Sequence, residues 1–331
     1  MLQDRIGRPI TALRVSVLDR CNLRCTYCMP ADIFDKNYTY LKHADILTFD
    51  EIKSVVKCAM NLGVRKIRLT GGEPLLRPNL YQLVANLKSL GIEEIAITTN
   101  GLLLEEQAEA LYQAGLNRVT VSLDTLDDTL FKKISGTAMS IQKVLEGLRA
   151  AQQIGFKGIK INAVIQKNIN EQEILPLVHF ARTQGLWLRF IEFMDVGQTN
   201  QWSKDQVVYG KQIQKMIHEI WPLRSVPQPT NHVAREWIYE DGLGKVGFIN
   251  SVSEAFCGGC DRGRLTADGF FYTCLFSANG LDLKSSLRNF CDLNVLTDLM
   301  ATQWSQRDDR YSELRAEMNH QPRIEMSRIG G

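Results

Sequence analysis

The chain has 331 residues, enough for one large domain or for a large and a small one. Hydrophobic residues make up 44% and charged residues 23%, which is typical of a globular protein rather than a disordered one. The formal net charge of +2 predicts no general attraction to nucleic acid or to a membrane surface, so an anionic ligand requires a local basic cluster.

The expected location follows from apolar segments and cysteines. The first residues contain no apolar stretch typical of a secretory signal, and no apolar run approaches the roughly 20 residues of a membrane-spanning helix. We therefore expect a cytoplasmic protein without nucleic-acid or membrane partners. In such a reducing compartment, clustered cysteines indicate metal or redox chemistry more often than disulfides. A monomer and a homodimer both remain possible.

Six of the eight cysteines form two groups of three. The N-terminal cysteine group has C-x3-C-x2-C spacing and consists of Cys21, Cys25 and Cys28. The C-terminal cysteine group has C-x2-C-x13-C spacing and consists of Cys257, Cys260 and Cys274. The other two cysteines stand alone in helical-looking segments, where a thiol ordinarily serves as a small buried apolar group. They are Cys58 and Cys291.

Three thiols leave one coordination position open on a metal centre. Catalytic metal sites keep such a position, whereas structural zinc sites usually close it with a fourth ligand. None of the five histidines flanks either group at zinc-finger spacing. An iron–sulfur cubane needs only three cysteines when its fourth iron has another ligand. The spacing therefore favours iron–sulfur clusters, with zinc and disulfides as the alternatives.

Strand and helix patterns alternate six times in the first 193 residues. The expected strands are 11–18, 66–69, 94–98, 118–123, 158–165 and 187–193. The first expected helix starts at Thr48 and ends at Gly63. Further helices are expected over 79–90, 104–114, 141–154 and 171–183. Short connections of this kind predict parallel strands, either as an open doubly wound sheet or as most of a barrel. Both place binding loops at the carboxyl ends of the strands.

The alternation stops after residue 196. We expect a helix over 209–220, a polar connector over 224–232 and a hairpin turn at Asp268-Gly269. Short strands are expected at 237–239, 246–250, 264–266 and 270–273, and helices at 282–287 and 293–317. A first domain over 1–223 and a C-terminal region over 224–331 follow from this change. Residues 31–47 are polar and aperiodic, and are expected to form a loop over the site.

Cations recur within otherwise apolar strands. They are Arg14, Arg68, Lys160 and Arg189. Those that point the same way would form a basic interior, and arginine suits phosphate because it makes bidentate contacts. The alternative for each is a surface position or a structural ion pair.

The N-terminal cysteine group follows a strand, and an aromatic residue, Tyr27, precedes its third cysteine. This arrangement resembles the radical S-adenosylmethionine (SAM) superfamily. The motif Gly71-Gly72-Glu73-Pro74 after the next strand strengthens the resemblance. In that superfamily the motif contacts the amino group of the SAM methionine, and glycine lets the backbone approach a ligand closely.

The C-terminal cysteine group, the segment Arg262-Gly263-Arg264 and the terminal Gly330-Gly331 narrow the resemblance. Over essentially the whole chain, the sequence is similar to the GTP 3′,8-cyclase (MoaA) family of molybdenum cofactor biosynthesis. The resemblance implies an α/β fold, an incomplete (β/α)6 TIM-like barrel. A C-terminal segment of short strands and helices would close its open side.

The resemblance also implies a reaction and its cofactors, two [4Fe-4S] clusters and SAM. One electron from the N-terminal cluster would cleave SAM, and the 5′-deoxyadenosyl radical would take hydrogen from C3′ of GTP. Attack of C3′ on C8 and reduction would give (8S)-3′,8-cyclo-7,8-dihydroguanosine 5′-triphosphate, while the second cluster binds guanine. The implied partners are an electron donor of flavodoxin or ferredoxin type and cyclic pyranopterin monophosphate synthase, which acts on the product.

The resemblance also implies site residues, each assigned to the matching position of this sequence. Contacts to SAM are assigned to Tyr27, Gly71, Gly72, Glu73, Ser122 and Met194. Contacts to GTP are assigned to Arg14, Arg68, Thr99, Lys160, Arg189, Arg262, Gly263 and Arg264. The catalytic group comprises Arg262, Arg264, Gly330 and Gly331. Glu73 is expected to orient its motif, and Thr98 is the alternative to Thr99. From the residues alone, Ser122 could be a strand cap, Met194 core packing and the glycine tail a disordered end.

Overall fold

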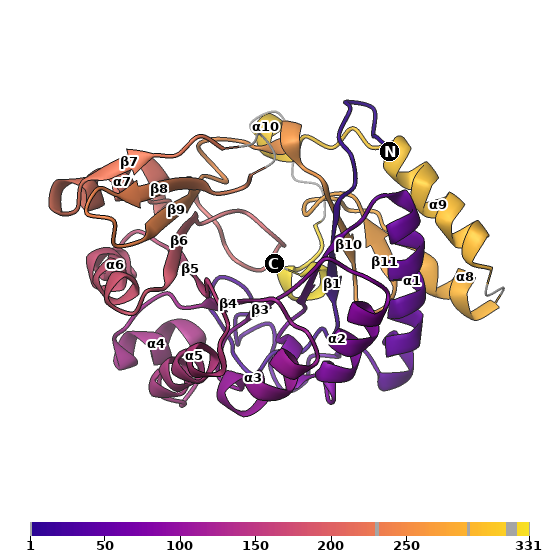
Figure 1. Ribbon diagram of the computed structural model, residues 1–331, viewed down its shortest axis with the longest axis horizontal. Coiled ribbons are helices and arrows are strands. Elements are labelled where there is room, and N and C mark those ends of the chain that lie inside the picture. The colour runs from indigo at the N-terminus through magenta and orange to yellow at the C-terminus, as the bar shows by residue number, and fades with distance from the viewer. Residues whose placement is uncertain (1, 229–231, 290–291, 316–322, 331) are drawn as a thin grey trace.

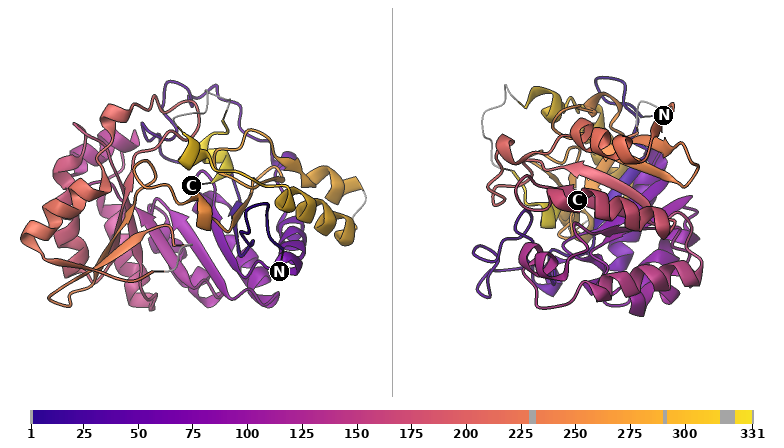
Figure 2. Two further views of the ribbon diagram at one scale, coloured as in Figure 1. Left: turned by 90° about the horizontal axis from the view of Figure 1, so that it is seen from above. Right: turned by 90° about the vertical axis from the view of Figure 1, so that its left-hand side faces the viewer.

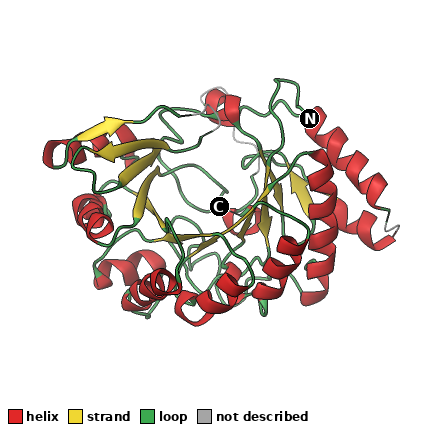
Figure 3. Cartoon of the chain, viewed as in Figure 1, coloured by secondary structure: helices red, strands yellow, loops and turns green. Residues whose placement is uncertain are grey.

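The computed structural model describes the chain except for residues 1, 229–231, 290–291, 316–322 and 331. A strongly curved sheet surrounds the interior, and most helices lie on its outer side (Figure 1). Figure 3 shows the same division by type, with loops and a short C-terminal helix inside the curve. The fold is therefore a parallel-rich α/β half-barrel.

The elements have the following bounds. The strands are β1 Ala12–Ser16, β2 Lys66–Thr70, β3 Glu94–Thr99, β4 Arg118–Ser122, β5 Lys160–Ile165, β6 Trp187–Glu192, β7 Leu223–Ser225, β8 Arg235–Tyr239, β9 Lys245–Ile249, β10 Arg262–Leu265, β11 Phe270–Tyr272 and β12 Leu281–Asp282. The α-helices are α1 Phe49–Leu62, α2 Leu80–Ser89, α3 Leu104–Gln113, α4 Asp128–Ser135, α5 Gln142–Ile154, α6 Ile174–Thr183, α7 Gly210–Ile220, α8 Leu283–Asn289, α9 Leu293–Ser305, α10 Tyr311–Leu314 and α11 Met326–Ile329. Short 3-10 turns are η1 His43–Asp45, η2 Pro74–Leu76, η3 Glu171–Glu173, η4 Lys204–Gln206 and η5 Cys257–Gly259.

The twelve strands form one sheet in the order β12-β11-β10-β1-β2-β3-β4-β5-β6-β9-β8-β7. Strands β1 to β6 are neighbours in sequence order and run parallel, which confirms the expected (β/α)6 core. Strands of the C-terminal part extend both edges, with β10 parallel to β1 and β9 parallel to β6. The sheet stays open between β12 and β7, and α10 lies across that opening, whereas α11 lies inside the curve (Figure 1).

Local signals explain why α1 forms where it does. Thr48 caps the helix by accepting a hydrogen bond from the Glu51 backbone at 3.1 Å, and the Glu51 carboxylate accepts one from the Thr48 backbone at 2.7 Å. Gly63 ends the helix with φ +122°, a value that side chains rarely allow. Both predicted boundaries are confirmed.

Some expectations about the C-terminal part were wrong. The helix expected over 293–317 ends at Ser305, because the backbone of Arg307 turns to bond the carbonyl oxygen of Trp304 and its side chain is drawn into the buried N-terminal segment. The connector expected from residue 224 begins inside β7, and β12 and α11 were not expected. The Asp268-Gly269 hairpin is confirmed, since β10 and β11 pair antiparallel across it.

The core lies between the outer face of the sheet and the helices. Cys58 on α1 is fully buried, and its thiol lies 3.3 Å from the carbonyl oxygen of Leu293 at the start of α9, which confirms its role as a packing residue. Helices α8 and α9 pack beside α1, far from β7 to β9, as the view from above shows (Figure 2). Cys291 lies outside the described residues. No described helix has the length and apolar character needed to cross a membrane.

Candidate active site

The two cysteine groups lie at opposite ends of the same strands. Cys21 follows the carboxyl end of β1, whereas Cys260 precedes the amino end of β10. Because β1 and β10 are parallel, these positions are at opposite ends of the half-barrel. Cys274 follows β11, which runs antiparallel to β10 and so ends beside Cys260. Five residues of strand separate the two ends by about 16 Å.

The N-terminal cysteine loop is held by the Gly71-Gly72 segment. The backbone of Gly72 donates to Leu18 O at 2.8 Å, and that of Glu73 donates to Arg20 O at 2.8 Å. A Cβ atom at Gly71 would lie 2.3 Å from Leu18 O, and one at Gly72 would lie 2.3 Å from Arg20 O. The glycines are therefore required for close approach to the chain that leads into the cysteine loop, in addition to any approach to a ligand.

Glu73 organises the neighbouring strand end. Its buried carboxylate accepts hydrogen bonds from the Thr99 hydroxyl at 2.7 Å and from the Asn100 backbone at 2.7 Å. Burial raises the pKa of Glu73 to about 7, although these hydrogen bonds oppose the rise. The Asn100 amide in turn donates to Asn22 Oδ1 at 2.7 Å and lies 3.8 Å from the Cys21 sulfur. Glu73 thus links β2, β3 and the cysteine loop, as its expected orienting role requires.

A small cavity of about 50 Å³ lies beside the N-terminal cysteine loop. Cys25, Tyr27 and Ser122 contribute to its wall together with Asp124. The Tyr27 hydroxyl donates to Asp124 at 2.6 Å, and Asp124 also accepts from the Val164 backbone at 2.8 Å. Burial raises the pKa of Asp124 to about 6. Two residues assigned to SAM therefore share this cavity, while Met194 lies in the loop after β6.

The thiols of the N-terminal group are half-buried and lie close enough for their charges to interact. Burial raises the pKa of Cys21 to about 11 and that of Cys28 to about 12. Burial followed by the charges of Cys21 and Cys28 raises the pKa of Cys25 well above its usual value. Three such thiols ionise together only when a cationic centre compensates their charge.

The donor sets fit clusters better than single ions. Among the described residues, no three His, Cys, Asp or Glu side chains converge closely enough to hold one metal ion. In a cubane each cysteine binds a different iron atom, so the thiols surround the cluster instead of meeting at one point. The six thiols are unpaired, and their arrangement as two sets of three suits two such clusters.

Cys260 of the C-terminal cysteine group has a more cationic surrounding, whereas burial followed by the charge of Asp309 raises the pKa of Cys274 to about 11. Burial alone would raise the pKa of Cys260, but Arg262 and Arg307 lower it to about 6. The Arg262 guanidinium lies 3.4 Å from the Cys260 sulfur. This thiol is therefore a thiolate near neutral pH, the form that binds iron.

Three arginines form one row across the inner face of the sheet, and we call Arg14, Arg68 and Arg264 the arginine row. Strand register places Arg14 opposite Arg264 on one side and opposite Arg68 on the other. None of the three forms an ion pair with a described carboxylate. Burial, together with neighbouring arginines, lowers the pKa of Arg68 and of Arg264 to about 10 each. Arg264 is buried, Arg14 and Arg68 are half-buried, and cations without a described carboxylate partner in such a setting are typical of a site for an anion.

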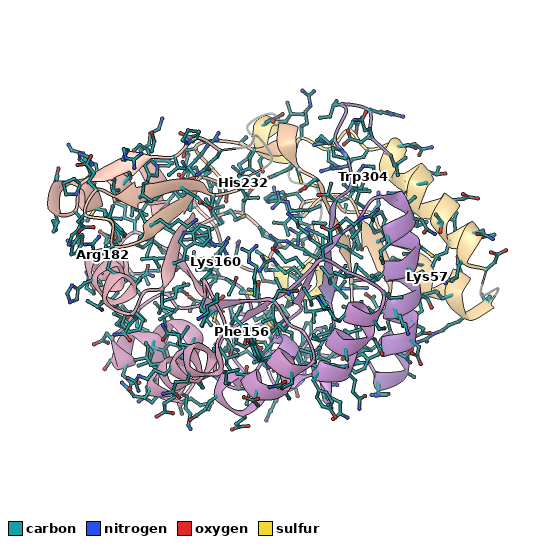
Figure 4. All side chains as sticks on the ribbon, viewed as in Figure 1. Lys57, Phe156, Lys160, Arg182, His232 and Trp304 are labelled. Carbon is teal, nitrogen blue, oxygen red and sulfur yellow. The ribbon has the colours of Figure 1, made fainter. Side chains whose placement is uncertain are left out.

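Lys160 and Arg189 extend the basic interior. The Lys160 ammonium lies 3.6 Å from the centre of the Trp187 ring, and it points into the half-barrel (Figure 4). Arg189 Nε donates to Asn162 at 3.0 Å, so Asn162 also faces inward. Burial and neighbouring arginines lower the pKa of Lys160 to about 6 and that of Arg189 to about 9.

The C-terminal tail enters this interior. Gly330 is buried, its carbonyl accepts a hydrogen bond from Arg264, and a Cβ atom on it would lie 2.4 Å from Thr70 Cγ2. Gly330 thus reaches the arginine row. Gly331, the other predicted tail residue, lies outside the described residues.

Two residues that were predicted to contact GTP, Thr99 and Gly263, face away from the interior of the half-barrel. The Thr99 hydroxyl is occupied by Glu73, while Thr98 accepts a hydrogen bond from Arg68 at 3.1 Å. Gly263 turns the position of its missing side chain towards Phe271, where a Cβ atom would lie 2.8 Å from the ring. Contacts of Thr99 and Gly263 with substrate stay predictions, and the geometry adds Thr98 as a candidate.

Sequence reasoning missed several polar residues of the site. They are Asn100, Thr120, Asp124 and Asp195. Asn100 and Asp124 each follow a strand end, so position was an available signal. Thr120 accepts a hydrogen bond from Arg68 at 3.3 Å, and it could have been found by its alternation with Ser122 on β4.

Comparison with known families covers most of the chain. The profile described as "Radical SAM superfamily" matches residues 15–181, and the profile described as "Molybdenum Cofactor Synthesis C" matches residues 186–313. A "GTP 3′,8-cyclase" of Xanthomonas axonopodis pv. citri (strain 306) is 48% identical over 100% of this chain and 99% of its own length. One of Staphylococcus epidermidis (strain ATCC 35984) is 44% identical over the same shares of both chains.

A solved structure supports the fold. The SAM-bound crystal structure of SuiB from Streptococcus suis aligns with a TM-score of 0.63 and 16% identity, covering 94% of this chain and 68% of that one. At this identity the similarity concerns architecture alone, and it confirms the expected partial barrel. The profiles and full-length relatives go further: the chain belongs to the radical SAM superfamily and, within it, to the GTP 3′,8-cyclase family.

Proposed function

We propose that the chain converts GTP to (8S)-3′,8-cyclo-7,8-dihydroguanosine 5′-triphosphate, the first step of molybdenum cofactor biosynthesis. Its full-length relatives are named GTP 3′,8-cyclase, and the second matching family model is named for molybdenum cofactor synthesis. The observation that carries the proposal is the arginine row, which lies on strands that run between the two cysteine groups. A triphosphate bound to this row would have its nucleoside within reach of both groups.

Two [4Fe-4S] clusters fit the two sets of three thiols, and the N-terminal one, when bound, supplies the electron that cleaves SAM to the 5′-deoxyadenosyl radical. Cys21, Cys25 and Cys28 would hold this cluster. Tyr27, Gly71, Gly72, Glu73, Ser122 and Met194 are the proposed SAM contacts. Within the chain, Glu73 and Asp124 orient the loops that carry these contacts, through the hydrogen bonds described above.

Binding and orientation of GTP fall to cations of the inner face. The proposed contacts are Arg14, Arg68, Thr98 or Thr99, Lys160, Arg189, Arg262, Gly263 and Arg264. Charge-assisted bonds to phosphate oxygens would compensate the mutual repulsion of these buried cations. Cys257, Cys260 and Cys274 would hold the second cluster, which would bind guanine at the end of the half-barrel opposite the N-terminal cysteine group. Because Arg264 bonds the tail, Gly330 and Gly331 would close the substrate inside and exclude water.

The proposal also covers the protein partners, the cellular compartment and the division of the chain. A flavodoxin or ferredoxin would supply electrons, and cyclic pyranopterin monophosphate synthase would consume the product. The unpaired cysteines suit the cytoplasm, a reducing compartment. We also propose the division into residues 1–223 and 224–331, with the second part providing the second cluster and the tail.

Anaerobic incubation of the iron–sulfur-loaded protein with SAM, GTP and dithionite tests the function. We expect 5′-deoxyadenosine to form in a GTP-dependent manner, in step with the cyclised nucleotide. Formation of 5′-deoxyadenosine while GTP stays unchanged would reject GTP as the substrate and favour another radical SAM activity, such as peptide modification. A protein that binds one or two zinc ions and no sulfide would instead be a zinc-stabilised nucleotide-binding module.

Variants separate the two cysteine groups. Cys21→Ala should abolish cleavage of SAM, whereas Cys58→Ala, which removes a fully buried thiol outside both groups, should retain it. Cys257→Ala should impair turnover of GTP more than uncoupled cleavage of SAM. Equal loss of both activities in Cys21→Ala and Cys257→Ala would contradict separate roles for the two groups.

A further inference from the structure

A buried carboxylate lies between two buried arginines beside the C-terminal cysteine group. Asp4 is 7% exposed, Arg8 is 2% exposed and Arg307 is 4% exposed. Arg8 Nε donates to Asp4 Oδ2 at 2.6 Å, and Arg307 Nη1 lies 3.3 Å from the same oxygen. Burying three charges is costly, and proteins keep such groups where their charge or geometry is used.

The same guanidinium groups hold the backbone of two cysteines. Arg8 Nη1 donates to the carbonyl oxygen of Cys257 at 2.8 Å, and Arg307 Nη1 donates to that of Cys260 at 2.7 Å. The third cysteine is connected through Asp309, whose carbonyl accepts from Arg8 at 2.8 Å and whose carboxylate accepts from Thr273, next to Cys274, at 2.6 Å. One network therefore reaches all three cysteines.

Aromatic packing fixes the network from the side of α9. Trp304 is fully buried and points from α9 towards the N-terminal segment (Figure 4). Its indole nitrogen donates to the Arg8 carbonyl at 3.1 Å, and the Arg307 guanidinium lies 4.5 Å from the centre of its ring. The two arginines thus come from opposite ends of the chain and have little freedom to move.

We propose that Asp4, Arg8 and Arg307 are positioning residues for the C-terminal iron–sulfur cluster and set its reduction potential. This inference rests on the second cluster of the proposed function. Reduction adds one electron, and so one negative charge, to the cluster. A nearby buried cation stabilises that charge and a buried anion opposes it, because protein interiors screen charges weakly.

The other charged side chains near these cysteines are left unchanged when Asp4 or Arg307 is substituted. They are Asp261, Arg262, Asp309 and Glu313, which bond Thr11, the Cys260 sulfur, Thr273 and the Gly258 backbone. Substitutions at Asp4 and Arg307 change the charge of the network in opposite senses. A role in setting the potential therefore predicts shifts of opposite sign, which a general loss of structure would not produce.

The experiment uses the full-length chain with Cys21, Cys25 and Cys28 all changed to Ala, so that iron reports on the C-terminal group alone. Into this parent we introduce Asp4→Asn, Arg307→Gln and, as a matched control, Arg5→Gln. Arg5 belongs to the same N-terminal segment, but its side chain is 61% exposed and pairs with the exposed Asp308. Iron and sulfide per chain, and redox titration followed by electron paramagnetic resonance, are measured anaerobically.

We expect about four iron atoms per chain in the parent. Arg307→Gln should lower the midpoint potential, Asp4→Asn should raise it, and Arg5→Gln should leave it unchanged. Loaded variants with unchanged potentials, or with shifts of the same sign at Asp4 and Arg307, would overturn the inference. A parent that binds no iron would reject the second cluster itself, and with it that part of the proposed function.

A second variant covers failure to fold or to load. Arg307→Lys keeps the charge but loses the planar guanidinium, whose Nη1 donates both to Asp4 and to the Cys260 carbonyl. With a native circular dichroism spectrum, it should load less iron or give an altered resonance line shape, because the cysteine turn loses a support. Full loading with an unaltered line shape would overturn the positioning role.

Discussion

Lys160 lies in a setting that disfavours its charge. Its ammonium contacts the Trp187 ring, and the Lys245 ammonium lies 3.3 Å from the centre of the same ring. Burial, followed by Arg189, Arg118 and Arg68, lowers the pKa of Lys160 to about 6, so most Lys160 side chains are neutral at pH 7.5.

This setting predicts proton uptake when GTP binds. A bound triphosphate favours the charged lysine and raises its pKa, so binding above pH 6 should take up as much as one proton. Below pH 6 Lys160 is already charged and the uptake should vanish. Between pH 6 and pH 8 the affinity should therefore fall as pH rises, by up to about tenfold per pH unit.

Isothermal titration calorimetry in buffers of different ionisation enthalpy measures this uptake. Lys160→Gln serves as the reference, because it keeps the titration of the triphosphate itself but lacks the amine. Equal proton uptake by both proteins at pH 7.5 would show that Lys160 is not the group that titrates.

Gly330 has a conformation and a neighbour that exclude a larger residue. Its φ is +80°, and a Cβ atom would lie 2.4 Å from Thr70 Cγ2. We expect Gly330→Ala to displace the tail and to slow cyclisation of GTP at least tenfold, with iron content unchanged. Product formation and iron analysis on the same preparation test this. A rate equal to that of the unsubstituted protein would show that the tail takes no part in the reaction.

At the scale of elements, the tail is held by the loop that follows β6. The Asp195 carboxylate accepts from the Tyr311 hydroxyl at 2.6 Å, from Arg315 at 3.0 Å and from Arg323 at 2.8 Å. Further along, Glu325 accepts from the Gln198 backbone at 3.0 Å and from the Thr199 hydroxyl at 2.9 Å. The loop after β6, which contains Met194, therefore positions the segment leading to Gly330.

Removing the second anchor should release the tail. Hydrogen bonds to a charged group contribute about 1.5 to 3 kcal/mol, so Glu325→Ala should leave at least about tenfold more chains with an unseated tail. Hydrogen–deuterium exchange of residues 323–330 should rise, and turnover of GTP should fall. Glu240→Ala, at an exposed position, is the control. Unchanged exchange in Glu325→Ala would show that Glu325 does not anchor the tail.

At the scale of the whole molecule, the half-barrel separates the two cysteine groups and places cations between them. Because β1 and β10 are parallel, the loop after one and the loop before the other cannot meet at the same edge. A radical formed at one end and a base bound at the other would therefore require a ligand that spans the interior. A nucleoside triphosphate has the length and the charge to do so.

Metal analysis tests this organisation directly. After anaerobic reconstitution we expect about eight iron and eight sulfide per chain, and about half of each when either cysteine group is replaced by alanine. Chelation of iron should abolish cleavage of SAM. Loss of all iron from either triple variant would contradict two independent sites.

Much of this protein was predictable because its signals are local. Cysteine spacing, the Gly-Gly-Glu motif and the capping box at Thr48 involve residues within a few positions of one another, so the parallel core and both cysteine groups could be found. The prediction of one helix end was wrong because distant contacts determine it. Helix α9 ends at Ser305, and beyond it Arg307 bonds Asp4. Neighbouring residues of a strand face opposite sides of the sheet, so a shift of one residue decides whether Thr98 or Thr99 faces the interior.

Cysteine spacing, the Gly-Gly-Glu motif and cations in apolar strands indicated the chemistry of the chain, because each pattern is visible within a short segment. The places where these groups meet depend on long-range contacts. Pairing of β1 with β10 joins residues about 250 positions apart, and no local pattern encodes that register. The same pairing aligns Arg14 with Arg264 and brings Arg8 and Arg307 to the C-terminal cysteines, because long-range burial selects partners that local propensity cannot.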